Sequence, residues 1–301
     1  MEKHVRAFCT LAMFVAVASP ATAQRDGLKV YISADMEGVV GVVTGDQLGP
    51  AGFEYSRFRE FMTREVIAAI DAAKAAGATE ILVSDSHGNG ENLVIEMLPA
   101  DVTLVRSWPR PLMMMQGIDE TFDAAILLGY HSGTHNPAGV RAHTMSSARL
   151  ADVRLNGQSV PEAGISAAIA GHFGVPVVMI SGDDAAVAEA QALIGDIEGA
   201  VVKWNYGFHS ARTLMPEAAY QLIGEKVTAA LARLENHEPY RVTAPVTLGI
   251  RFKSWRPSEV LSYLPIVERV DAHAIEYVGD TMIEISKFIE FVTTYSVALE
   301  P

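Results

Sequence analysis

The chain has 301 residues, half of them apolar and a fifth of them charged, and its formal net charge is −13. A chain of this length and composition can bury one large core or two modest ones, which excludes an intrinsically disordered protein. The acidic balance argues against nucleic acid or an anionic membrane surface as a partner, because phosphate binding relies on clustered Lys and Arg.

The amino terminus has the pattern of a secretory signal peptide. Lys3 and Arg6 are followed by an apolar stretch, and Ala21-Thr22-Ala23 forms an A-x-A cleavage site. A membrane anchor is disfavoured, because a spanning helix needs about 20 apolar residues and Ser19-Pro20 interrupts the run. We therefore predict a signal peptide over residues 1–23, a periplasmic or secreted mature protein, and no stable membrane anchor.

The cysteine content restricts the metal chemistry of the mature protein. The single cysteine, Cys9, lies inside the predicted signal peptide and has no apolar stretch upstream, which argues against a lipoprotein cleavage site. The mature chain would then contain neither disulfides nor thiolate ligands. Any bound metal would be held by His, Asp and Glu.

Three apolar runs each end in residues that bind metals. These runs lead into Asp35-Met36-Glu37, Asp85-Ser86-His87 and Gly129-Tyr130-His131. In an open parallel sheet, ligands bind in the crevice beyond the carboxyl ends of the strands. Each motif alone is weak, because acidic pairs and lone histidines are common in structural roles. Three strand ends of this kind together predict a metal site.

Helices alternate with strands over most of the chain. Apolar residues at helical spacing predict a helix from about Glu54 to Ala76, ended by Gly77. Further strands are predicted over Val102–Val105 and Val177–Ile180, and further helices from Pro161-Glu162, after Asp183-Asp184, and from about Pro216 to Leu234. This alternation predicts an α/β fold with a mainly parallel sheet flanked by helices.

The carboxyl-terminal part has a different pattern. Beyond a polar stretch that ends at Pro239, we predict strands over Val246–Phe252 and Ile275–Val278 and a long amphipathic helix after Asp280. We therefore expect an α/β core over residues 24–240. A smaller α+β element over residues 241–301 is expected to pack on this core.

The α/β core contains further candidate site residues. His131, His135 and His143 share a loop that contains glycine and proline, and loops mounted on a rigid sheet often carry catalytic groups. Glu162 lies at a predicted helix start. From the residues alone, it is best interpreted as an acid that the helix dipole favours.

Five motifs, taken in order along the chain, carry a resemblance to a known family. They are Asp35-Met36-Glu37-Gly38, Asp85-Ser86-His87, Gly129-Tyr130-His131, His143-Thr144-Met145 and Pro161-Glu162-Ala163-Gly164. In this order and at these separations they resemble the bacterial zinc-dependent D-aminopeptidase family. The resemblance extends from about Lys29 to the carboxyl-terminal helix.

The resemblance implies two zinc ions in each subunit. One ion would be held by Asp35, Glu37 and His87. The second would be held by Asp35, His131 and Glu162, so that Asp35 bridges the ions and Glu162 is a ligand rather than a dipole-favoured acid. Zinc accepts imidazole and carboxylate ligands, although Mn or Co would accept the same set.

The resemblance also implies an activity. His143 matches the family's catalytic histidine and is expected to act near the scissile carbonyl as acid, base or oxyanion stabiliser. We predict a metallopeptidase that removes the amino-terminal residue of short peptides, prefers D-amino acids, and forms a ring-shaped homo-oligomer. The alternatives are a related metal-dependent amidase or L-aminopeptidase and, less favoured, a periplasmic peptide-binding protein.

Two histidines have no assigned role. His135 belongs to none of the five motifs. His209 lies with several aromatic residues in the segment Lys203–Arg212, which could line a pocket, pack inside the protein or contact another subunit.

Overall fold

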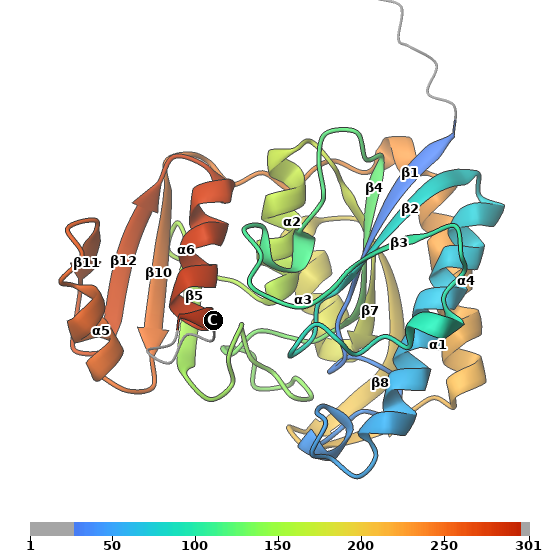
Figure 1. Ribbon diagram of the computed structural model, residues 1–301, viewed down its shortest axis with the longest axis horizontal. Helices are drawn as coiled ribbons and strands as arrows, with labels where there is room; N and C mark the ends of the chain where they lie inside the picture. The colour runs from blue at the N-terminus through green and yellow to red at the C-terminus, as the bar shows by residue number, and fades with distance from the viewer. Residues whose placement is uncertain (1–26, 296–301) are drawn as a thin grey trace, which may run out of the picture.

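The computed structural model describes residues 27–295, so the predicted signal peptide over residues 1–23 lies outside the described residues. Two sheets lie side by side, each packed against helices (Figure 1). The larger sheet contains β1 (Leu28–Ala34), β2 (Ala78–Asp85), β3 (Thr103–Val105), β4 (Ala124–Tyr130), β7 (Val177–Asp183), β8 (Glu198–Gly207) and β9 (Ser210–Thr213). The smaller sheet contains β5 (Leu150–Leu155), β6 (Gln158–Ser159), β10 (Val246–Phe252), β11 (Val267–Arg269) and β12 (Ala274–Gly279).

The larger sheet has the strand order β3-β2-β1-β4-β7-β8-β9. Neighbouring strands are parallel, except that β9 returns antiparallel to β8. This confirms the α/β class with a mainly parallel sheet. Because β1 lies between β2 and β4, the three strands that precede the metal-binding motifs end next to one another.

Helices cover both faces of the larger sheet. The α-helices are α1 (Tyr55–Ala75), α2 (Glu162–His172), α3 (Asp184–Ile194), α4 (Pro216–Leu231), α5 (Arg256–Leu261) and α6 (Met282–Thr294). Helices α1 and α4 cover one face, and α2 and α3 cover the other (Figure 1). Every residue of β4 is buried, as expected for a strand covered on both faces. Gly77 has φ +100°, the left-handed conformation that a helix-ending glycine adopts.

The smaller sheet is antiparallel, with the strand order β11-β12-β10-β5-β6. Two of its strands, β5 and β6, come from within the range predicted as the core, residues 24–240. The boundary at residue 240 therefore does not separate the two sheets. The sequence pattern predicted β10, β12 and α6 but not the short elements β5, β6, α5 and β11, and it did not recognise Lys203–Arg212 as part of the β8–β9 hairpin.

One buried core connects the two sheets. It includes Leu127 of β4, Ile165 of α2, Leu248 of β10 and Ile285 of α6. Short 3-10 helices occupy Gly45–Gln47, Ile95–Met97, Met113–Met115 and Leu234–Asn236. Within residues 27–295, no helix combines the length and the apolar character that crossing a membrane requires.

Candidate metal centre

The ends of β1 and β4 are held in close contact at the site. The backbone N–H of Asp35 donates to the carbonyl of Leu128 at 2.8 Å, and that of Gly38 donates to the carbonyl of Gly129 at 2.6 Å. A Cβ atom on Gly38 would lie 2.1 Å from the carbonyl oxygen of Tyr130, so only glycine fits there. This contact fixes the backbone on both sides of Glu37 beside the end of β4.

The six predicted site residues lie in one cluster. His87 Nδ1 is 2.8 Å from Glu37 Oε2 and 3.2 Å from Asp35 Oδ1. His131 Nε2 is 3.4 Å from Asp35 Oδ2 and 3.5 Å from Glu162 Oε1. The two oxygens of Asp35 therefore face different histidines, as expected of a carboxylate between two cations.

Backbone carbonyls orient both histidines. His87 Nε2 is 2.7 Å from the carbonyl oxygen of Leu48, and His131 Nδ1 is 3.0 Å from that of Ser132. A carbonyl only accepts hydrogen bonds, so in the neutral form that binds a metal each ring would donate through this nitrogen. The lone pairs of His87 Nδ1 and His131 Nε2 then point at the carboxylates. Metal-binding histidines usually have this arrangement, in which the second ring nitrogen donates to a fixed acceptor.

Several buried atoms of the cluster have close polar neighbours but form no well-aligned hydrogen bond. They are Asp35 Oδ2, Glu37 Oε2 and His131 Nε2, although buried polar atoms are nearly always paired. Ligand atoms of Asp35, Glu37 and His131 lie within 4.8 Å of one another, as do those of His131, His143 and Glu162. Carboxylate oxygens and imidazole nitrogens at these separations fit zinc. The assignment of individual ligands stays a prediction.

The electrostatics also indicate a site built for cations. Burial and the neighbouring Glu37 carboxylate raise the pKa of Asp35 to about 7. Burial alone would lower the pKa of His131, but the carboxylates of Glu162, Asp35 and Glu37 raise it to about 10. Without a metal, the cluster therefore retains protons near neutral pH. Metal binding would displace these protons.

His143 lies at the edge of the cluster. Its ring stacks on that of His131, with 4.0 Å between the ring centroids and an angle of 9° between the planes. Nδ1 is 2.9 Å from the carbonyl oxygen of Arg141, and Nε2 is 3.6 Å from Glu162 Oε1. Burial and the nearby His131 lower the pKa of His143. A neutral imidazole in this position could accept a proton, although the geometry would also permit metal ligation.

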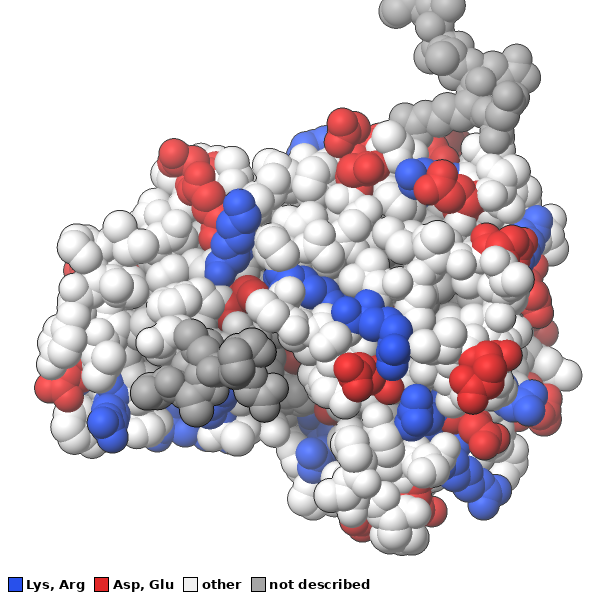
Figure 2. Space-filling model, viewed as in Figure 1, with Lys and Arg blue, Asp and Glu red and all other residues white. Residues whose placement is uncertain are grey.

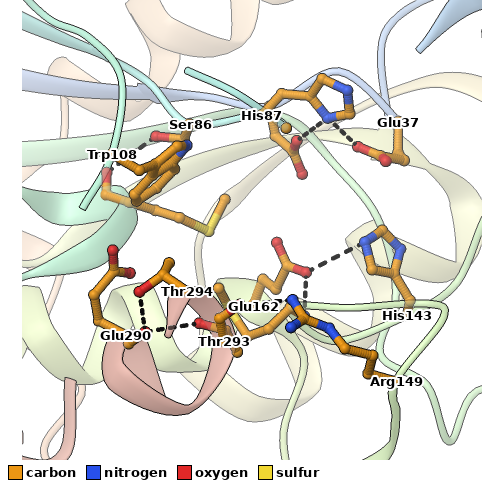
Figure 3. Close-up of a pocket in the computed structure, with 14 residues that line it drawn as sticks. Glu37, Ser86, His87, Trp108, His143, Arg149, Glu162, Glu290, Thr293 and Thr294 are labelled. Carbon is orange, nitrogen blue, oxygen red and sulfur yellow. Dashed lines mark hydrogen bonds and ion pairs between the residues drawn. The ribbon is translucent and has the colours of Figure 1, made fainter. Parts of the chain in front are cut away.

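A cavity of about 260 Å³ opens onto the cluster. Figure 3 shows His87 and Glu37 on one side, and Glu290, Thr293 and Thr294 of α6 on another. The wall of the cavity is therefore shared between the larger sheet and the carboxyl-terminal part of the chain.

The cavity contains residues that sequence reasoning missed. Arg149, just before β5, lines it and donates from Nη2 to the carbonyl of Thr293 at 2.6 Å. Glu290 accepts a hydrogen bond from the backbone N–H of Arg110 at 3.0 Å. Neither residue belongs to a motif, and no signal in the sequence separates them from other charged residues on their elements.

His135 and His209 lie outside the cluster. His135 Nε2 is 2.7 Å from Oε1 of Glu189 on α3, an ion-pair position that anchors the loop. His209 Nε2 is 3.0 Å from Nη1 of Arg141. Because the Arg141 carbonyl contacts His143, the tip of the β8–β9 hairpin braces the loop behind the predicted catalytic residue.

A parallel sheet whose strand ends gather carboxylates and histidines around a cavity defines a metal-dependent hydrolase. The chain belongs to the D-aminopeptidase family: the model of peptidase family M55, described as D-aminopeptidase, matches residues 28–291.

Two comparisons with individual proteins agree. The chain is 33% identical to the D-aminopeptidase of Bacillus subtilis (strain 168) over 261 residues, which covers 85% of this chain and 93% of that protein. Among solved structures, it is similar to the Zn-dependent D-aminopeptidase DppA from Bacillus subtilis, described as a self-compartmentalizing protease. The TM-score is 0.85 at 30% identity, over 90% of this chain and 100% of the other. The protein is therefore a hydrolase, a metallo-aminopeptidase.

Proposed function

We propose that this protein is a binuclear zinc aminopeptidase that removes the amino-terminal residue of short peptides and prefers D-amino acids. The observation that carries the proposal is the position of Asp35, with one carboxylate oxygen toward His87 and the other toward His131. A carboxylate shared in this way suits two adjacent cations. The D-preference is supported by the family and by the Bacillus subtilis relative.

The chain offers a separate ligand set for each ion. Asp35, Glu37 and His87 would hold one zinc ion, and Asp35, His131 and Glu162 would hold the second. Bound zinc polarises a carbonyl oxygen and lowers the pKa of a water molecule. Met145 donates its backbone N–H to Glu162 Oε1 at 2.6 Å and so helps to orient this carboxylate.

His143 would transfer a proton during peptide-bond cleavage. Its Nδ1 is committed to the Arg141 carbonyl, so Nε2 is the atom that would accept or donate the proton. The lowered pKa keeps this imidazole neutral near pH 7, the form in which it can act as a base.

A preference for short peptides is supported by the charge of the cavity wall. Among the described residues that line it, Arg149 is the single Lys or Arg, and four carboxylate residues share the lining: Asp35, Glu37, Glu162 and Glu290. Arg149 uses Nη2 on Thr293. Nε contacts Ser146 Oγ at 3.4 Å, so Nη1 would bind the terminal carboxylate of a short peptide whose amino end lies at the metal centre.

We also propose that the enzyme is exported and that it forms a ring-shaped oligomer. The signal-peptide pattern over residues 1–23 and the start of the family match at residue 28 support a periplasmic or secreted enzyme.

The self-compartmentalizing relative supports a ring-shaped oligomer. The smaller sheet and its helices also expose large apolar side chains: Trp255, Val260, Tyr263, Ile266, Val270 and Val278. On the face shown in Figure 2, the charged residues of this half lie mainly at its upper and lower margins, with uncharged residues between them, and exposed apolar patches often mark protein contacts.

A substrate panel with zinc-loaded protein tests the function. D-Ala-D-Ala should be cleaved about 10–200-fold faster than L-Ala-L-Ala, because the wrong enantiomer loses a contact or meets a clash. N-acetyl-D-Ala-D-Ala should resist cleavage, and metal analysis should give two zinc ions per chain. Faster cleavage of the L-peptide would make the protein an L-aminopeptidase. Binding of these peptides without cleavage of any would indicate a peptide-binding protein.

A further inference from the structure

A buried lysine lies directly behind the metal centre. Lys203 on β8 is fully buried. Its Nζ donates to three backbone carbonyls: those of Glu37, Val39 at 3.1 Å and Val42 at 2.7 Å. All three acceptors lie within residues 36–42, after β1, a segment that contains the predicted zinc ligand Glu37.

The lysine makes no ion pair within residues 27–295. The carboxylates of Asp183 and Glu65 attract it from a greater distance. Burial of an ammonium group is costly unless it is compensated. Here the three carbonyl oxygens provide the compensation, much as carbonyl oxygens coordinate a bound monovalent cation. An apolar side chain would fill this space without the cost of burying a charge. The lysine is therefore expected to act through its bonds to the carbonyl oxygens.

The segment over residues 36–42 is held mainly by hydrogen bonds to neighbouring parts of the chain. It contains neither helix nor strand, and two backbone turn bonds link its residues, Val39 N–H to Met36 and Val42 N–H to Val39, each at 3.1 Å. From the other side, Oε1 of Glu65 on α1 accepts the backbone N–H of Val40 at 2.9 Å. Gly38 N–H also donates to the carbonyl of Gly129 at 2.6 Å, and Gly41 N–H donates to Thr213 Oγ1 at 2.9 Å. The Lys203 ammonium adds to these contacts by binding three carbonyl oxygens of the segment at once, including that of Glu37.

We propose that Lys203 is a positioning residue of the metal centre: its ammonium is a built-in cation that fixes residues 36–42 and thereby places Glu37 for zinc. The inference rests on the proposed zinc-dependent function. Its main readouts are zinc affinity and chemical rescue, neither of which requires catalysis.

The first test replaces the charge and keeps the bulk. Lys203→Met should weaken zinc binding about 10–100-fold, the usual effect of losing a group that supports a metal ligand. The matched control is Lys226→Met, which removes a lysine that pairs with Glu198 near the surface and should bind zinc as the wild type does. Isothermal titration of metal-free protein with zinc gives both affinities.

The second test restores the cation. In Lys203→Ala, millimolar n-propylammonium should recover most of the zinc affinity, whereas n-propanol, an alcohol of the same size, or sodium chloride at the same concentration should not. Equal rescue by the alcohol would show that the lysine acts by packing and would overturn the proposal.

The remaining outcomes are also decisive. Wild-type zinc affinity in Lys203→Met would overturn the inference, and so would a variant that stays unfolded with zinc present, because the lysine would then serve the whole fold. If the wild type itself bound no zinc, the proposed function would fail. That result is distinct from a wild type and a variant that bind zinc equally well.

Discussion

The two sheets of this protein contribute different things to one site. Asp35, Glu37, His87 and His131 follow the carboxyl ends of parallel strands in the larger sheet. None of the six predicted site residues lies on a strand of the antiparallel sheet, whose helix α6 forms a wall of the cavity instead. Parallel neighbours end at the same edge and so bring their following residues together. Antiparallel neighbours end at opposite edges and disperse them.

The remaining two site residues lie where the chain crosses between the sheets. His143 is on the segment that leaves β4 for β5, and Glu162 follows β6 as the chain enters α2. The metal centre therefore belongs to the parallel half, whereas the approach to it is shared. Substitutions can test this division, from the largest expected effect to the smallest.

The largest effect is expected from substitution of Asp35, which follows β1 of the larger, mainly parallel sheet. Asp35→Ala should remove both zinc ions and reduce hydrolysis of D-Ala-D-Ala below detection, because one carboxylate serves both ligand sets. Metal analysis and activity assays measure both effects. The control Asp271→Ala removes an exposed acid of the antiparallel half that pairs with Arg251, and it should retain full zinc and activity. Two zinc ions per chain in Asp35→Ala would rule out the bridging role.

The next largest effect is expected from substitution of His143, on the segment that connects β4 with β5. His143→Ala should keep its zinc and lose about 10²–10⁴-fold in kcat, the range for loss of an acid–base group. His135→Ala is the matched control, because His135 lies in the same loop but contacts Glu189; its kcat should stay within several-fold of the wild type. Loss of zinc from His143→Ala would reassign His143 as a metal ligand.

A smaller and substrate-dependent effect is expected at Arg149. Loss of a charged hydrogen bond to substrate is worth about 10–100-fold, so Arg149→Ala should lower kcat/KM for D-Ala-D-Ala by that factor. The kcat/KM for D-Ala amide, which lacks the carboxylate, should hardly change.

The alternative is that Arg149 simply caps the carboxyl end of α6 through Thr293. Equal losses on both substrates, accompanied by a lower melting temperature, would support that structural role. Arg154→Ala is the control for loss of a nearby positive charge, because Arg154 lies on β5, five residues after Arg149, and pairs with Asp152.

The smallest effect on catalysis is expected from substitution of exposed apolar residues next to the smaller, antiparallel sheet. Tyr263 and Ile266 are 74% and 62% exposed, so the double substitution to serine should reduce the assembly mass in light scattering while zinc content stays unchanged. Ile95→Ser, on the larger half and 49% exposed, should leave the mass unaltered. An unchanged mass in the double variant would exclude this surface from the subunit contact.

The fold could be predicted from sequence where burial leaves a simple pattern. Strands β1, β2 and β4 contain apolar runs because helices cover both faces of their sheet, and α1 has a long helical period ended by Gly77. Strand β11 has three residues and β6 has two, too few for any period to emerge.

The site could be predicted only in part, for a related reason. The residues at the strand ends are marked by the strands that precede them. Glu162 could be assigned only through the family resemblance, because an acid in the first turn of a helix is ordinary. Lys203 and Glu37 are separated by 166 positions, and nothing local to β8 indicates which backbone a buried ammonium will bind. Contacts of this kind are determined by tertiary structure alone.

The insertion of β5 and β6 between His143 and Glu162 has a consequence for how such a protein can be divided. Cutting the chain after residue 240 would remove β10 and leave the β10-facing edge of Leu150–Leu155 unpaired, an exposed edge of the kind that promotes aggregation. The antiparallel half is therefore not a detachable module that could be exchanged between enzymes.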